Sequence, residues 1–165
     1  MNRTVSVALT MCVLAAVTAA PASATPPTRE VVDFSGEELV DDVCAFPLLF
    51  EDEGRAIITT HYDNTGVPVR QQEVYPGTRS TVTNVDTGES YSLTFIGPHL
   101  VTFDPDGSYV RTGTGPWIWG VVHPTTDERG LFVLRGRWQM AVDAEGNAEM
   151  LGFTGSSINL CELLA

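Results

Sequence analysis

Two tryptophans separated by a single residue, Trp117 and Trp119, are the clearest candidates for ligand contact in the sequence. Residues i and i+2 of a strand point to the same face, so the two indole rings would stand side by side. Such a pair can form a platform for a sugar or a flat apolar ligand. It can equally plug one end of a barrel, because tryptophan buries a large apolar ring with one N–H to satisfy. The pattern favours packing, and ligand contact by Trp117, Trp119 and Trp138 is the alternative.

A second pair of side chains, Arg135 and Arg137, shares one face of a long apolar run. If that face is the inside of the domain, the two guanidinium groups would bind the carboxylate or phosphate head group of a ligand. If it is the outside, they pair with surface carboxylates. The outward orientation is favoured, and ligand binding by Arg135 and Arg137 remains the alternative.

The usual catalytic and metal-binding motifs are not found in the sequence. His61, His99 and His123 lie on different predicted strands, without a His-x-His or His-Glu-x-x-His pair to indicate zinc. Ser156 has no Gly-x-Ser-x-Gly elbow around it. The Asp-Pro-Asp-Gly-Ser stretch at 104–108 has its glycine in the fourth place, which is typical of a hairpin turn rather than a calcium loop. We therefore predict no catalytic residue, no metal ion and no cofactor.

The first 24 residues have the pattern of a cleavable signal peptide. Arg3 is followed by an apolar run over 5–20, and Ala22-Ser23-Ala24 has the small-x-small form of a cleavage site. Cys12 lies inside the apolar run behind a large Met11, which argues against a lipid anchor. We therefore predict a secreted, extracellular protein with no membrane span in the mature chain.

Cleavage would leave Cys44 and Cys161 as the only cysteines, near the two ends of the mature domain. In an oxidising compartment such an isolated pair is expected to form a disulfide. Cleavage would also remove Arg3, leaving 8 arginines against 21 carboxylates and a net charge of −13, with no lysine. Such a charge disfavours binding to nucleic acids and anionic membranes. Nine carboxylates lie in 30–53, so this acidic stretch is the expected site for a cationic protein partner.

The residues that separate the apolar runs predict the fold. From residue 43 onward, short β-branched and aromatic runs alternate with turn sequences every 8 to 12 positions. No interval has room for a crossover helix, so neighbouring strands are expected to pair antiparallel in a meander. We predict an all-β domain of about 8–10 strands, most simply a closed up-and-down barrel, with a sandwich as the alternative. The predicted organisation is a signal peptide (1–24), an acidic N-terminal segment (25–42) and the β-barrel domain (43–165).

At the C-terminus the pattern changes. Asn159 with Glu162 resembles a capping box, followed by leucines, and predicts one helical turn held by the Cys44–Cys161 disulfide.

Several short stretches carry a resemblance to known proteins: Val43 to Pro47, Thr81 to Asn84, Asp106 to Ser108 and Leu160 to Leu164. In this order they resemble small secreted proteins of high-GC Gram-positive bacteria (actinobacteria). That resemblance implies no activity and no functional residues. The expected architecture is also loosely similar to lipocalin-type (calycin-like) barrels and to the barrel of allene oxide cyclase, which implies a fold and not a function.

Three functional hypotheses follow from the sequence. The first is a non-enzymatic binding protein that holds a small, mostly apolar ligand in or at the mouth of the barrel. The second is a protein-interaction or inhibitor module that acts through its acidic N-terminal segment. The third is a barrel isomerase or cyclase that uses buried polar groups such as His61, His99 or Glu73.

Overall fold

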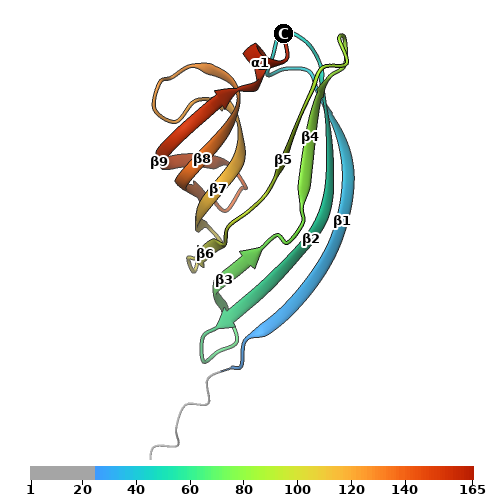
Figure 1. The fold of residues 1–165 in the computed structure, drawn as a ribbon. Coiled ribbons are helices and arrows are strands. Elements are labelled where there is room, and N and C mark those ends of the chain that lie inside the picture. Colours follow the sequence, from blue (N-terminus) through green and yellow to red (C-terminus); the bar gives the residue numbers. More distant parts are fainter. Residues whose placement is uncertain (1–24) are drawn as a thin grey trace, which may run out of the picture.

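The computed structural model describes residues 25–165 (Figure 1). The predicted signal peptide, with Cys12 inside it, lies outside the described residues. Over 25–165 no helix is both long enough and apolar enough to span a membrane.

The all-β prediction is confirmed: the described chain forms nine antiparallel strands in one sheet and a short C-terminal helix. The elements are β1 (Thr28–Val40), β2 (Leu48–Tyr62), β3 (Pro68–Val74), β4 (Arg79–Asn84), β5 (Ser90–Thr94), β6 (His99–Phe103), β7 (Tyr109–Val122), β8 (Arg129–Val142), β9 (Ala148–Asn159) and α1 (Leu160–Leu163).

Alternation of inward and outward residues explains why these runs form strands. In β4, Ser80, Val82 and Asn84 are buried, while the residues between them are more exposed. A side chain in a strand points to the face opposite its neighbour's, so this pattern turns one face toward the core. β1 is different, because almost all of its residues are exposed and pairing with β2 along its full length is what holds it.

The long strand β2 organises the sheet. One edge pairs with β1, while the other pairs with β4 over its first half and with β3 over its second half. β3 and β4 thus follow one another along β2 and are separated by residues 75–78. In the gap, Thr78 Oγ1 accepts a hydrogen bond from Arg55 N (3.2 Å) and donates one to Arg55 O (3.1 Å). Gly54 permits this approach, since a Cβ there would lie 2.4 Å from Thr78 Oγ1.

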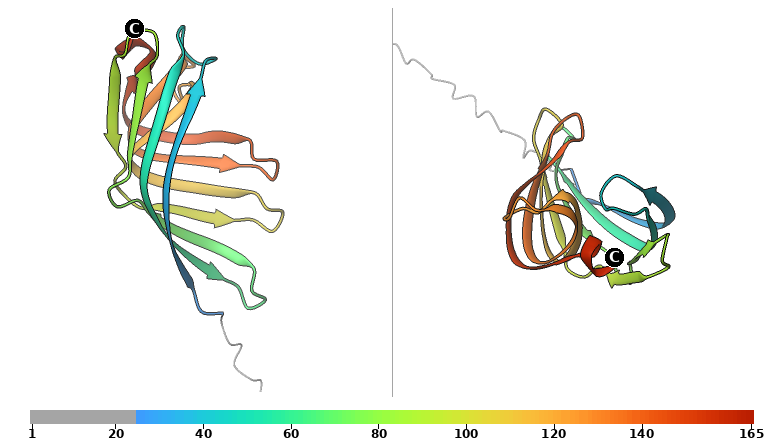
Figure 2. Two further views of the ribbon diagram at one scale, coloured as in Figure 1. Left: turned by 90° about the vertical axis from the view of Figure 1, so that its right-hand side faces the viewer. Right: turned by 90° about the horizontal axis from the view of Figure 1, so that it is seen from above.

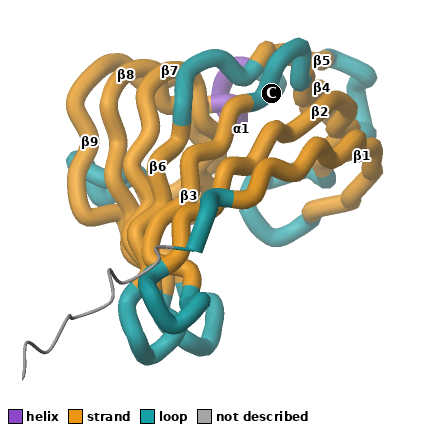
Figure 3. Tube along the Cα trace, turned by 90° about the horizontal axis from the view of Figure 1, so that it is seen from below, coloured by secondary structure: helices purple, strands orange, loops and turns teal. Residues whose placement is uncertain are grey.

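This interruption corrects the meander prediction. β3 pairs with β6 rather than with β4, and β5 pairs with β4 rather than with β6. The strand order is β5-β4-β2-β3-β6-β7-β8-β9, with β1 beside β2, and none of the described strands pairs β9 with β1 or β5. The sheet is therefore open where a closed barrel was expected. It bends so that β7–β9 form one wall and β1, β2, β4 and β5 form another (Figures 2 and 3).

The main apolar core fills the space between these walls at the end that carries α1. Leu48, Val82 and Leu93 pack there with Leu131, Val133, Leu160 and Leu164. The predicted helical turn is present as α1, and Asn159 Oδ1 caps it by accepting a hydrogen bond from Cys161 N. The Cys44–Cys161 disulfide is confirmed and joins the segment before β2 to α1.

Candidate functional site

A row of inward-facing residues crosses the sheet at its centre. Glu73 on β3 pairs with His99 on β6, His99 pairs with Gly113 on β7, and Gly113 pairs with Trp138 on β8. Gly113 leaves room for the indole of Trp138, because a Cβ there would lie 2.2 Å from Cζ2 of that ring. The indole consequently reaches across β7 and contacts the ring of His99, with ring centroids 4.9 Å apart.

Around Glu73 the sheet assembles a buried ionic cluster, which consists of Glu73, Tyr75, His99 and Arg111. Glu73 is only 4% exposed. Its Oε1 accepts a hydrogen bond from Arg111 Nη2 (3.0 Å), and its Oε2 accepts one from the Tyr75 hydroxyl (2.7 Å). His99 Nδ1 lies 3.9 Å from the same Oε2. The carboxylate is thus paired and hydrogen-bonded, which is the condition for keeping a charge buried.

Burial decides the protonation states in this cluster. Loss of solvent lowers the pKa of His99, the charge of Glu73 partly opposes this shift and Arg111 adds to it, and the resulting pKa is about 4. The imidazole is therefore neutral at pH 7. Burial also raises the pKa of Tyr75, helped by its hydrogen bond to Glu73 and by that charge, so the phenol keeps its proton and remains a donor.

Tyr75 also belongs to an aromatic pocket that opens beside the cluster. The pocket encloses about 170 Å³, and six residues line it: Phe34, Asp52, Tyr75, Thr78, Phe95 and Trp117. The ring of Phe95 connects two of the others, with centroids 6.5 Å from Tyr75 and 5.9 Å from Trp117. Tyr75 and Trp117 each contact His99 as well, at 5.0 and 5.2 Å. The buried ionic cluster therefore supports the pocket wall from behind.

Asp52 is the one carboxylate that borders the aromatic pocket. Its Oδ1 is buried and has no hydrogen-bond partner among the described residues. The other inward carboxylate, Glu73, is bonded on both oxygens.

The three tryptophans named from the sequence have different positions. Trp117 lines the pocket, whereas Trp138 is 0% exposed and packs behind it, with ring centroids 4.9 Å apart. Trp119 packs against an apolar cluster of Trp138, Met140 and Val142, and it donates a hydrogen bond from Nε1 to the carbonyl of Val122 (2.7 Å). One of the three is thus available to a ligand in this pocket.

Arg135 and Arg137 lie on the exposed face of β8, outside the aromatic pocket. Arg135 Nη2 donates a hydrogen bond to the Tyr91 hydroxyl (2.7 Å), which links the wall of β8 to β5. This placement agrees with the outward orientation.

The three histidines also lie in different places. His99 joins Glu73 in the cluster, but His61 follows the buried Thr60 in β2 and so points to the opposite face. His123 is buried elsewhere, with Nε2 2.9 Å from the Ser157 hydroxyl. In the described part of the chain, no group of three or more His, Cys, Asp or Glu side chains is arranged to hold a metal ion.

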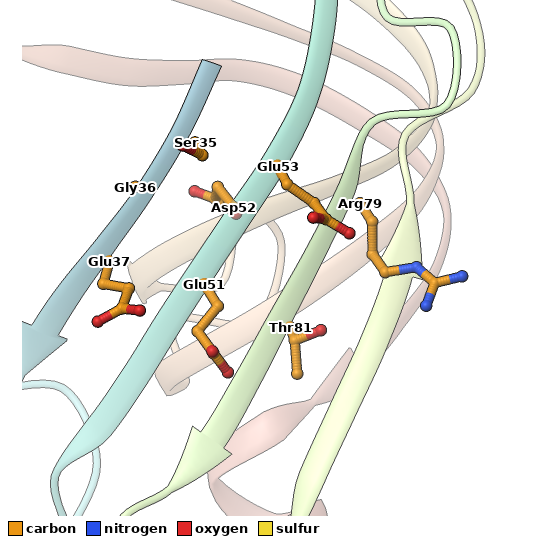
Figure 4. A pocket seen from close by; sticks show the side chains of 8 residues that line it. All are labelled: Ser35, Gly36, Glu37, Glu51, Asp52, Glu53, Arg79 and Thr81. Atoms are coloured by element: carbon orange, nitrogen blue, oxygen red, sulfur yellow. The ribbon is translucent and has the colours of Figure 1, made fainter. Parts of the chain in front are cut away.

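An acidic groove runs along the outer side of β1, β2 and β4 (Figure 4). It encloses about 520 Å³, and its lining residues are Ser35, Gly36, Glu37, Glu51, Asp52, Glu53, Arg79 and Thr81. Glu37 and Glu51 stand directly opposite each other in the β1–β2 pairing. Like charges in that arrangement repel, so the sheet tolerates an unfavourable pair here.

The sequence did not indicate Phe34, Asp52, Tyr75 or Phe95 as site residues. A partial signal was present for Phe34, the only bulky aromatic residue in an otherwise acidic and aliphatic stretch. The other three lie on or next to β2, β3 and β5, and the pairings of β2 with β3, β2 with β4 and β4 with β5 bring them together.

Comparison with known proteins gives no match, whether with protein-family models, curated proteins or solved structures. The resemblance to secreted actinobacterial proteins and to barrel families stays a prediction.

Proposed function

We propose that this chain is a secreted binding protein that holds a small, mostly apolar ligand in the aromatic pocket. The observation that carries the proposal is a cavity walled by four aromatic rings, those of Phe34, Tyr75, Phe95 and Trp117. None of the four rings belongs to a fully buried residue, so a ligand can reach them from solvent. Ligand sites are typically concave and mostly apolar, with a few polar groups that fix orientation.

The size of the pocket limits the ligand. An apolar cavity of about 150 Å³ can hold a benzene-sized molecule. At about 170 Å³, the aromatic pocket suits a single ring or a compact branched group and not a fatty acid or a steroid.

Binding is favoured over isomerase or cyclase chemistry by the geometry of the buried groups. Glu73 and His99 stand behind the pocket wall and not in the lining. Both oxygens of Glu73 are engaged by Arg111 and Tyr75. A general base must reach the proton that it abstracts, directly or through one water, and neither residue is placed to do so.

Secretion is supported by the disulfide, which joins residues 117 positions apart. Such bonds form and persist in oxidising compartments and are rare in the cytosol. The strongly acidic composition is compatible with a soluble extracellular protein.

Titration with benzyl alcohol and cyclohexanol, followed by tryptophan fluorescence, tests the proposal. We expect saturable binding that changes the emission of the wild type. Trp119→Phe should keep the signal, because Trp119 is not in the pocket lining, and Trp117→Phe should lose most of it. If two-dimensional NMR shows no shift at pocket residues with either probe, the proposal is wrong.

The acidic groove favours a second candidate function, capture of a cationic protein partner. The opposed Glu37–Glu51 pair supports it, because a cation bound between the two would relieve their repulsion. An arginine-rich peptide should bind the wild type more weakly as salt rises. Glu37→Gln with Glu51→Gln should reduce this binding, and unchanged binding by the double variant would exclude the groove.

A further inference from the structure

We propose that the ligand of the aromatic pocket is a small organic cation, an alkylated ammonium group, held between the aromatic rings and the carboxylate of Asp52. This inference rests on the proposed function and specifies its ligand class.

The arrangement of the rings is the first argument. Phe34 comes from β1 and Trp117 from β7, while Tyr75 directly follows β3 and Phe95 directly follows β5, so four segments converge on one small cavity. The face of an aromatic ring carries partial negative charge and attracts a cation within about 6 Å of its centroid. Several such rings around one cavity form the kind of cage that recognises quaternary ammonium groups.

Asp52 supplies the second argument. Its buried Oδ1 has no hydrogen-bond partner within residues 25–165, and no ion pair there includes Asp52. Two carboxylates on neighbouring strands do have arginine partners: Asp33 pairs with Arg55 at 2.6 Å and Glu73 with Arg111 at 3.0 Å. A buried carboxylate oxygen without a partner is destabilising. A cationic ligand would supply the counter-charge that Asp52 lacks within residues 25–165.

The charged groups around the pocket favour a cation over an anion. Arg111 is bonded to Glu73, and His99 is neutral at pH 7 behind Tyr75 and Trp117. Arg79 borders the acidic groove and is not in the lining of the aromatic pocket. Glu51 and Glu53 flank Asp52 in β2, and the whole chain carries a net charge of −12, which raises the local concentration of cations.

The volume of the aromatic pocket limits which part of a ligand can enter it. A trimethylammonium group is compact and presents methyl groups on every side, which suits a cavity of about 170 Å³ lined by rings. A bare metal cation would lack that contact, and a long amphiphile would have to leave its chain outside.

Choline and its neutral isostere 3,3-dimethylbutan-1-ol separate charge from shape. By isothermal titration calorimetry on the mature protein, we expect choline to bind at least about tenfold more tightly than the isostere. Asp52→Asn keeps the shape of the side chain and should remove most of that preference. Phe95→Leu keeps an apolar side chain and should weaken choline more than the isostere.

The matched control is Glu51→Gln, which removes a carboxylate from the same strand one residue away but outside the aromatic pocket. It should change choline affinity by less than about twofold at 0.15 M salt. Equal binding of choline and the isostere, or an unchanged preference in Asp52→Asn, would overturn the cation assignment and leave the proposed function standing. Failure of both molecules and of the neutral ring probes to bind would overturn the proposed function as well.

Discussion

Carboxylates on the inner and outer faces of the sheet differ in whether the chain supplies them with a partner. On the outer face, Glu37 and Glu51 oppose each other in the acidic groove, and neither forms an ion pair within residues 25–165. On the inner face, Glu73 is 4% exposed and is held by Arg111 and Tyr75. Water screens the outer carboxylates, whereas a carboxylate buried as deeply as Glu73 needs a partner within the chain. The difference shows that the acidic composition alone says little about where a carboxylate matters.

The largest expected effect comes from removing one carboxylate charge from each face and comparing the stability of the two variants. Glu73→Gln leaves the Arg111 guanidinium without its counter-charge and should lower the free energy of unfolding by about 3–5 kcal/mol. Glu51→Gln should change it by less than about 0.5 kcal/mol, because the outer carboxylate is solvated. Urea denaturation measures both, and equal effects of the two variants would contradict the contrast.

Two glycines extend the comparison from charge to packing. Gly113→Ala places a Cβ 2.2 Å from the Trp138 ring and should cost about 1–3 kcal/mol of stability. Gly36 lies in the acidic groove and has no atom within 4 Å of an added Cβ. Gly36→Ala should be neutral or should stabilise by up to about 1 kcal/mol. Thermal unfolding of the pair tests whether the inner face is the tightly packed one.

Acid should act on the inner face first through His99. Its folded pKa, about 4, lies below the ordinary value of 6.5, so the unfolded chain binds this proton more readily. The contribution of neutral His99 is therefore complete above pH 6.5 and is lost as pH falls from there toward 4. We expect a loss on the order of 2 kcal/mol between pH 7.5 and pH 5. NMR titration of the imidazole measures the pKa directly, and a value near 6.5 would refute the burial argument.

The smallest effect is expected at the outer carboxylate pair. Glu37→Gln removes the repulsion between Glu37 and Glu51 and should stabilise the protein by about 0.3 kcal/mol. The gain should vanish in 1 M salt, because screening already weakens the repulsion there. Chemical denaturation at low and high salt measures this, and a loss of stability would show that Glu37 has a favourable partner.

The fold class could be predicted from alternation and turns, but the pairing could not. The 104–107 turn is a clear case, with Gly107 N donating to the carbonyl of Asp104 as expected for a hairpin. β1 was not recognised because both of its faces are exposed, which removes the hydrophobic pattern that identifies a strand. A closed sheet was expected from the number of strands alone. Because residues 75–78 interrupt the chain between β3 and β4, β3 pairs with β6 while β4 pairs with β5, and the sheet stays open.

The candidate site was predictable only in part. Trp117 could be identified from its spacing with Trp119, and Glu73 and His99 were plausible buried polar groups. Their meeting depends on the β3–β6 pairing, which joins residues that are 26 positions apart and has no local signature. Asp52 looks like any other member of an acidic run, and only the direction of its side chain distinguishes it from Glu51.

The Cys44–Cys161 bond gives the domain the covalent form of a ring. Eight of the nine strands lie within that ring, and of the described residues only 25–43, which include β1, and 162–165 lie outside it. A protease that cuts one exposed hairpin tip, such as the one at 104–107, would open the ring without releasing a fragment. The two pieces would stay tethered at their far ends, so the strands on either side of the cut could still hold their places in the sheet.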